Sequence, residues 1–254
     1  MPVIRSPAQS PVKVASRFII RLLFAALFTV SIVAAIVPAH AEEESSRHLA
    51  PGFTARPAQS RLLILPPEME LFSISAGGIE EPRADWTEAA QKHFRAALDA
   101  RRQELGANIV DIDERQLDDF GQVLALHRNV AESVFYHHTG FGPKLPTKDG
   151  KLLWTLGRDA VRPLKERTGA DYALFTWIRD SYASNERKAT IVAMALLGSI
   201  MLGGEQVGYA SLVDLNDGRV VWFNDLRRLS GDLREAEPAT ETVKALLEKF
   251  PPLK

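Results

Sequence analysis

The turn Asn216-Asp217-Gly218 constrains the fold of this chain more than any other short segment. The segments on either side of it, 206–215 and 219–226, are rich in β-branched and aromatic residues, as strands are. An Asn/Asp-Gly turn between two such segments joins antiparallel strands, because its central residues tolerate positive φ. The sequence therefore predicts an antiparallel hairpin in the last quarter of the chain.

Strands and helices alternate before this hairpin. The apolar run 62–65 stops at Pro66-Pro67 and is typical of a buried strand. The segment 69–75 is either a second strand or an ordered loop. We expect further strands over 108–112 and 171–182, and helices over 86–105, 114–137, 152–167 and 238–250. This order predicts an α/β (α+β) fold, with a mixed β-sheet, a C-terminal antiparallel hairpin and helices packed on the sheet.

Several residues indicate where these helices begin and end. Asp85 is a good N-cap for the first long helix, and Gly106 is a good end for it. Pro238 is predicted at position N1 of the last helix. Gly121 is a weak point inside the helix predicted over 114–137, and Pro163 disturbs the helix predicted over 152–167.

The amino-terminal segment 1–41 has the pattern of a secretory signal. Four basic residues and no acid precede or begin the apolar run 22–37, and Ala39 and Ala41 supply the small residues of a cleavage site. We expect cleavage after Ala41 and a periplasmic or secreted protein; the alternative is an amino-terminal inner-membrane anchor. The predicted organisation is a signal peptide over 1–41, a flexible tether over 42–60 and a single periplasmic α/β domain over 61–254.

Composition excludes several classes of protein. The chain has no cysteine, which removes disulfides, thiolate nucleophiles, Cys-ligated metals and a Cys-linked lipid. Without the four Lys/Arg of the segment 1–41, 27 basic side chains face 32 acidic ones, so the remaining chain carries a net charge of −5. A mildly acidic protein does not favour nucleic acid as a partner.

Ala189 to Leu202 (ATIVAMALLGSIML) is the segment with two open interpretations. It is apolar throughout, follows Arg187-Lys188 and precedes Gly203-Gly204. A run of this length is too short to span a membrane as a helix, and it lacks the alternation of a membrane β-strand. Burial in the core or in a self-association surface is the interpretation we favour; contact with a membrane or an apolar partner is the other.

Four residues are candidates for chemistry. Asp111 and Asp113 end a predicted strand and could hold a divalent cation, although Asp113 also suits the cap of the next helix. His137 and His138 either line a mouth beside a Gly-rich loop or complement a helix C-terminus. Because none of these pairs forms a recognised motif, and no nucleophile elbow, P-loop or HExxH is present, we predict no catalytic, cofactor-binding or metal site and no cofactor.

Two stretches carry a resemblance to a known group. Residues 169–174 (GADYAL) begin a strand after a helix, and 210–222 (ASLVDLNDGRVVW) form the predicted hairpin. This arrangement resembles the periplasmic α/β domain shared by the curli-secretion lipoprotein CsgG, the amino-terminal domain of TolB and related envelope (lipo)proteins. The resemblance covers most of 60–250 in the order of elements, with 61–66 matching that domain's first strand and 86–105 its first helix.

The resemblance implies a non-catalytic module for envelope assembly, export or partner docking. No catalytic residues carry over, and Asp214, Asp217, Gly218 and Trp222 match at structural positions only. This chain departs from the group in two ways: it has no Cys for a lipid, and 189–202 does not alternate as the transmembrane hairpins of pore-forming members do.

We therefore expect a non-enzymatic exported envelope protein that binds a partner in envelope assembly or transport. The expected partner is another envelope protein or a second copy, with membrane contact possible through Ala189 to Leu202 and no nucleic acid. The alternative is a secreted hydrolase or metal-dependent enzyme. It requires Asp111, Asp113, His137 or His138 to converge on one pocket.

Overall fold

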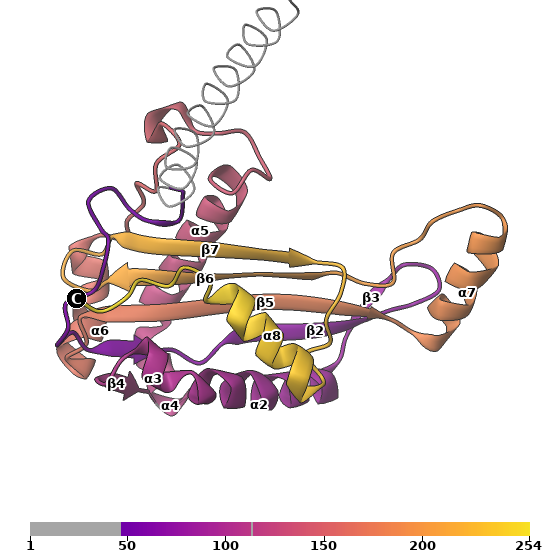
Figure 1. Cartoon of the computed structure of the whole chain (residues 1–254), viewed down its shortest axis with the longest axis horizontal. Coiled ribbons are helices and arrows are strands. Elements are labelled where there is room, and N and C mark those ends of the chain that lie inside the picture. The colour runs from indigo at the N-terminus through magenta and orange to yellow at the C-terminus, as the bar shows by residue number, and fades with distance from the viewer. Residues whose placement is uncertain (1–46, 113) are drawn as a thin grey trace, which may run out of the picture. The chain divides into compact units, whose positions relative to one another are not determined.

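The computed structural model describes residues 47–112 and 114–254 (Figure 1). The predicted signal peptide over 1–41, its cleavage site and the start of the predicted tether lie outside the described residues.

A mixed sheet forms the centre of the molecule, with β5 (Tyr172–Ala183) as its longest strand. β5 pairs in parallel with β1 and β2 and antiparallel with β6. β4 extends the sheet beside β1, β3 beside β2, and β7 beside β6. The other strands among the described residues are β1 (Leu62–Ile64), β2 (Glu68–Ile74), β3 (Glu80–Pro82), β4 (Ile109–Asp111), β6 (Gln206–Asp214) and β7 (Val220–Arg228). The predicted mixed sheet is confirmed, and 69–75 contains a strand.

Helices cover both faces of the sheet (Figure 1). α2 and α8 pack on one face and α5 and α6 on the other, each face with its own apolar cluster. The α-helices of the described residues are α2 (Ala84–Ala100), α3 (Arg102–Leu105), α4 (Glu114–Leu117), α5 (Gly121–His137), α6 (Arg158–Thr168), α7 (Asn185–Leu196) and α8 (Ala236–Leu246). Two 3₁₀ turns lie at Asp118–Phe120 and Pro146–Lys148.

The predicted hairpin is confirmed as β6 and β7. Gly218 has φ +81°, and a Cβ at this position would lie 2.5 Å from the Gly157 carbonyl oxygen. Both the conformation and the close approach require glycine here. On β7, Trp222 is fully buried and meets Phe250 edge-on, with ring centroids 5.1 Å apart.

The sequence misplaced two helix starts. α2 begins after Arg83, not Asp85, because Thr87 Oγ1 accepts from Leu71 N and donates to the Arg83 carbonyl, which joins the helix start to β2. Pro238 lies two residues inside α8 rather than at N1, and its missing N–H still falls in the first turn, where helices leave N–H groups unpaired.

Two helix spans were also wrong. The start of the helix predicted over 152–167 is extended: Val220 N donates to the Trp154 carbonyl and Thr155 bridges Arg219, so α6 begins only at Arg158. The helix predicted over 114–137 is interrupted by the 3₁₀ turn immediately before Gly121.

Residues 47–60 pack on the body of the molecule. Leu49 bridges Trp222, and Arg56 bridges Leu253, with Arg56 N donating to Pro252 O and Lys254 N donating to Arg56 O. Arg56 is 1% exposed and donates to the carbonyls of Leu105 and Pro251. Burial lowers its pKa to about 10. This guanidinium therefore fastens the two ends of the described body together.

Candidate functional site

The arm, residues 184–205, projects from the body of the molecule beside the ends of β2 and β5 (Figure 1). It consists of α7 and an irregular return loop, and it extends beyond the helices that cover the sheet (Figure 1). Ser184 is the N-cap of α7, and its hydroxyl accepts from Arg187 N at 3.2 Å. No residue of α7 is buried.

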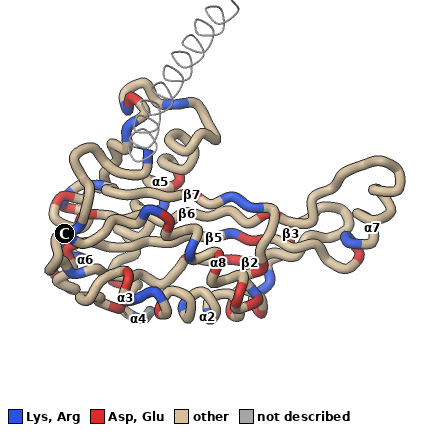
Figure 2. Tube along the Cα trace, in the orientation of Figure 1, with Lys and Arg blue, Asp and Glu red and all other residues tan. Residues whose placement is uncertain are grey.

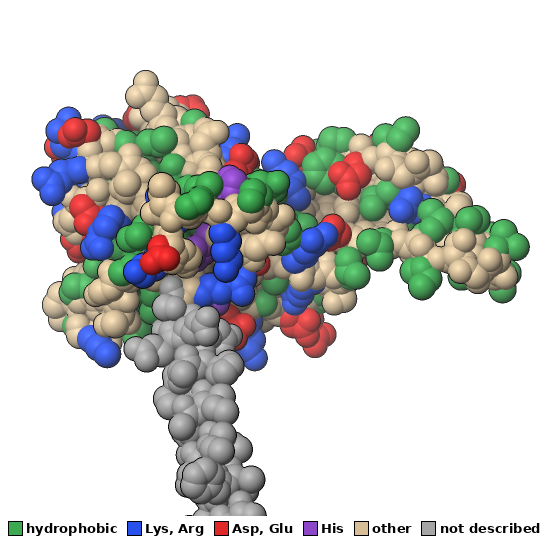
Figure 3. Space-filling view, turned by 90° about the horizontal axis from the view of Figure 1, so that it is seen from above, with side chains coloured by type: hydrophobic (Ala, Val, Ile, Leu, Met, Phe, Trp, Pro, Cys, Tyr) green, Lys and Arg blue, Asp and Glu red, His purple; other side chains and the backbone are tan. Residues whose placement is uncertain are grey.

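Apolar side chains gather at the tip of the arm (Figure 3). Leu196 and Ile200 are 84% and 95% exposed, and three more large apolar side chains are exposed there: Val192, Leu197 and Leu202. Figure 2 shows the same region as a long uncharged stretch, since residues 189–204 contain no ionisable side chain. Isolated apolar residues are common on surfaces, whereas a contiguous cluster marks an interaction site.

Arg187 holds the base of the arm. Its Nη2 donates to the Leu202 carbonyl at 3.0 Å, and its Nη1 donates to the Ser75 carbonyl at 3.4 Å. The first bond closes the return loop onto α7. The second ties α7 to the β2–β3 turn, which also carries the 67% exposed Ile79. The exposed apolar segment is therefore held by defined contacts at its base.

The arm leaves the sheet at the pair Asp180–Gln206, the last registered pair of β5 and β6. Asp180 is 2% exposed and accepts from Gln206 Nε2 at 2.7 Å and from the Tyr182 hydroxyl. Burial raises the pKa of Asp180 to about 6, partly offset by these two donors. Next to Asp180, the main chain of Ser181 packs against Gly204. A Cβ at position 204 would overlap the Ser181 carbonyl oxygen, so only glycine fits there.

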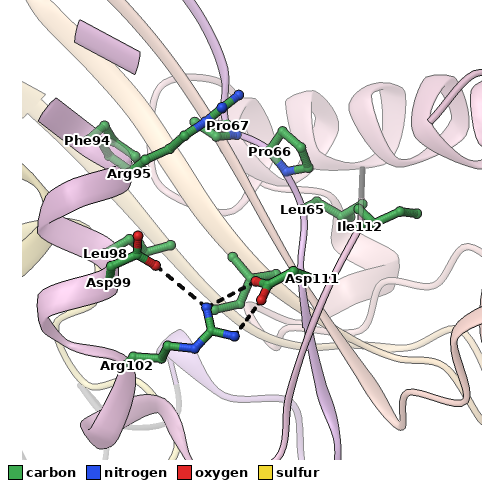
Figure 4. Close-up of a pocket in the computed structure, with 11 residues that line it drawn as sticks. Leu65, Pro66, Pro67, Phe94, Arg95, Leu98, Asp99, Arg102, Asp111 and Ile112 are labelled. Carbon is green, nitrogen blue, oxygen red and sulfur yellow. Dashed lines mark hydrogen bonds and ion pairs between the residues drawn. The ribbon is translucent and has the colours of Figure 1, made fainter. Parts of the chain in front are cut away.

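A separate cavity of about 470 Å³ lies where β1 and β4 end (Figure 4). Phe94 and Leu98 of α2 and the Pro66-Pro67 segment form apolar walls. At its edge Arg102 Nη2 lies 2.5 Å from Asp111 Oδ2, and Arg102 Nη1 lies 3.6 Å from Asp99 Oδ1. The bond to Asp111 raises the pKa of Arg102. Arg102 and its two carboxylates thus pair with one another at the edge of this cavity.

The three sequence candidates that the structure describes, Asp111, His137 and His138, do not come together. Asp111 pairs with Arg102 at the end of β4, whereas His137 and His138 lie at the far end of α5, a helix about 25 Å long. His137 Nδ1 contacts the Pro143 carbonyl at 2.8 Å and His138 Nε2 the Arg47 carbonyl at 2.7 Å. Asp113 lies outside the described residues. No cluster of three metal-ligating side chains occurs in the part of the chain that the structure describes.

One Ser–His contact was not predicted. His127 Nε2 lies 2.6 Å from Ser211 Oγ, and the imidazole stacks on Phe175 with centroids 3.7 Å apart. Both polar residues are buried, and burial lowers the pKa of His127 to about 3. A pair closed off from solvent cannot receive a substrate, so this contact stabilises the packing of α5 on the sheet.

The sequence favoured burial of Ala189 to Leu202 in the core or in a self-association surface. Burial in the core is wrong, because no residue of α7 is buried and Leu196 and Ile200 are exposed. Burial between copies of the chain stays a prediction. Apolarity predicts burial only when another element covers the segment, and none of the described residues covers the tip. Sequence reasoning also missed the root cluster of Asp180, Tyr182 and Gln206. The signal for it was a pair of charged residues, Arg179-Asp180, inside a strand that is otherwise uncharged. Among the described residues, no helix is both long and apolar enough to cross a membrane.

Comparisons with known proteins give distant structural similarities. No protein-family model and no curated protein matches the chain. The PelC dodecamer from Paraburkholderia phytofirmans is 12% identical, with a TM-score of 0.37 over 79% of this chain and 96% of that chain. Lipoprotein GNA1162 from Neisseria meningitidis is 14% identical, with a TM-score of 0.31 over 75% and 97%. The LpoB C-terminal domain from Salmonella enterica is 14% identical, with a TM-score of 0.28 over 70% and 87%.

These values mark a distant structural similarity, and one of the three proteins is a lipoprotein.

Proposed function

We propose that this chain is a non-enzymatic exported envelope protein that binds its partner through the apolar tip of the arm. The single observation that carries the proposal is the cluster of exposed apolar side chains around Leu196 and Ile200. Exposure of apolar side chains to water is unfavourable in free energy, and a bound partner that covers them removes this cost. The rest of the described chain keeps its large apolar side chains mostly inside two cores.

Export is supported by the sequence of the segment 1–41, with its basic start, apolar run and Ala39-His40-Ala41 site. We propose cleavage after Ala41, a tether that begins at Glu42 and a single periplasmic α/β domain. The non-enzymatic assignment is supported by the separate partners of Asp111, His137 and His138, which are Arg102 and the carbonyls of Pro143 and Arg47. It is also supported by the burial of the Ser211 side chain.

Fractionation of cells that make the full chain tests this proposal. We expect the protein in the envelope fraction, with an amino terminus at Glu42 when it is sequenced. The double variant Leu196→Gln, Ile200→Gln should move the exported protein to the soluble periplasmic fraction, since it removes the most exposed apolar surface of the tip.

The matched control changes two exposed leucines of the body, Leu126 and Leu153, to Gln. It should leave the distribution unchanged, because these side chains lie outside the arm. An arm variant that fractionates as the unaltered protein does would contradict the proposal, as would a cytoplasmic location.

A further inference from the structure

We propose that the partner of the arm is a lipid surface, into which the tip inserts at the boundary between headgroups and acyl chains. This inference rests on the proposed function and names the partner of the same site. Four properties of the arm support it: the width of its exposed apolar face, the chemistry of its tip, the position of its charges and the depth that its backbone permits.

The exposed face of α7 is wide. Its exposed positions beyond the charged base run from Ala189 through Val192, Ala193 and Ala195 to Leu196. At about 100° per residue these positions cover about 160° of the helix circumference. The face continues into the loop at Leu197 and Ile200. The stripe that a surface helix turns toward a protein core is at least about 100° wide, and this face is wider than that lower limit. A width of this kind favours a fluid apolar surface that contacts the helix from many directions.

The tip lacks the groups that give protein interfaces their specificity. Within 189–204 the only side-chain hydroxyls belong to Thr190 and Ser199, and Thr190 Oγ1 already donates to the Glu186 carbonyl at 3.0 Å. Protein interfaces surround their apolar centre with hydrogen-bonding groups, whereas a bilayer needs none.

The charges of the arm lie at its base. Glu186, Arg187 and Lys188 precede the tip, and Glu205 follows it. These two acidic and two basic side chains would lie in the polar headgroup layer, and their formal charges sum to zero. Binding should therefore depend on apolar area and only slightly on the net charge of the lipid.

The backbone limits the depth of insertion. α7 has 12 residues and is about 18 Å long, and 197–205 return to the sheet without regular structure. Irregular backbone is not tolerated in the hydrocarbon centre, where its polar groups lack partners. The tip therefore lies in the outer part of one leaflet, at a depth of about 5–10 Å, as interfacial helices do.

The absence of cysteine makes a direct test available. A single-cysteine variant, Ile200→Cys, of the protein purified from exporting cells is labelled with an environment-sensitive nitrobenzoxadiazole probe. Vesicles of phosphatidylcholine should raise the probe's fluorescence at least about twofold and shift it to the blue. The matched control is Leu153→Cys, which replaces an exposed apolar side chain of the body. The fluorescence of a probe at this position should not change when vesicles are added.

Two variations sharpen the result. Vesicles with about a quarter phosphatidylglycerol, in about 0.1 M or 0.5 M salt, should give the same affinity within about twofold. Adding Leu196→Gln and Leu197→Gln to the labelled protein should weaken partitioning by about tenfold or more, because both side chains are largely exposed.

Three outcomes would overturn the inference. The probe at position 200 does not respond to any vesicle, it responds only to anionic vesicles, or it shifts with protein concentration alone, which would identify a second copy as the partner. If fractionation responds to the arm variant while vesicles do not bind, the partner is a protein and the proposed function survives. If fractionation does not respond, the proposed function itself fails.

Discussion

β6 and the arm that precedes it are adjacent in sequence, similarly apolar and opposite in exposure. Every residue of β6 except Val207 is buried, because β5 and β7 pair with it on both sides and helices cover both faces. The arm has one anchored base, and Ile200 at its tip is 95% exposed. The comparison shows that an apolar segment is stabilised by burial. Whether the segment is buried within its own chain depends on which elements pack against it.

The largest expected contrast is between a core side chain and a tip side chain. Trp222→Ala should lower the free energy of unfolding by about 3–5 kcal/mol, since it empties a fully buried site. Leu196→Ala should change it by less than about 0.5 kcal/mol. Urea unfolding of both variants measures the difference. A large loss for Leu196→Ala would show that the tip is packed in solution.

His127 should make the body sensitive to acid. Its folded pKa of about 3 lies below the ordinary 6.5, so its contribution is complete above pH 6.5 and is lost as the pH falls toward 3. Between about pH 7 and pH 4.5 this loss is about 3 kcal/mol. His127→Gln should remove that part of the pH dependence, measured by urea unfolding at both pH values. An unchanged profile would show that the imidazole is not buried as described.

Asp180, at the root of the arm, should act in the opposite direction. Its folded pKa of about 6 lies above the ordinary 3.8, so its contribution is complete in acid and is lost as the pH rises through 6. The change between about pH 4.5 and pH 7 is about 2 kcal/mol.

The two groups oppose each other over this range, so the unaltered protein should show a shallow profile. Asp180→Asn removes the opposing contribution of Asp180. Between about pH 7 and pH 4.5 the variant should therefore lose about 2 kcal/mol more of its free energy of unfolding than the unaltered protein does. Parallel profiles for the variant and the unaltered protein would contradict the buried root.

A small effect is also expected at the cavity beside β4. The Arg102–Asp111 pair is short, but its side chains are 39% and 62% exposed. Surface pairs contribute at most about 1 kcal/mol, so Asp111→Asn should change the free energy of unfolding by less than that. The measurement is again urea unfolding, now at low and high salt. A larger, salt-independent loss would show that this edge of the sheet is a second packed region.

Local signals in the sequence were enough for part of the fold. Asn216 to Gly218 predicted the hairpin correctly because its geometry depends on a few adjacent residues. The strand alternative for 69–75 was confirmed. The helix over 114–137 is interrupted by a 3₁₀ turn immediately before Gly121, next to the weak point that the sequence had shown.

Long-range contacts account for what the sequence could not predict. Trp154 and Thr155 are extended because they meet Val220 and Arg219, which lie far away along the chain. Arg83 precedes α2 in place of Asp85 because Thr87 contacts Leu71 of β2. The arm follows the same rule. No local pattern distinguishes an apolar helix that will be covered from one that remains exposed.

The parallel pairing of β1 with β5 also sets the order of events in folding. Leu62 pairs with Tyr172, so the chain must close the long loop between these two residues before the centre of the sheet exists. Pairings across such separations form slowly, because the entropy of closure is lost before the contacts are gained. We expect this closure to limit the rate of folding. Until it occurs, the centre of the sheet is unformed, and the two apolar clusters on its faces have no common surface to pack on.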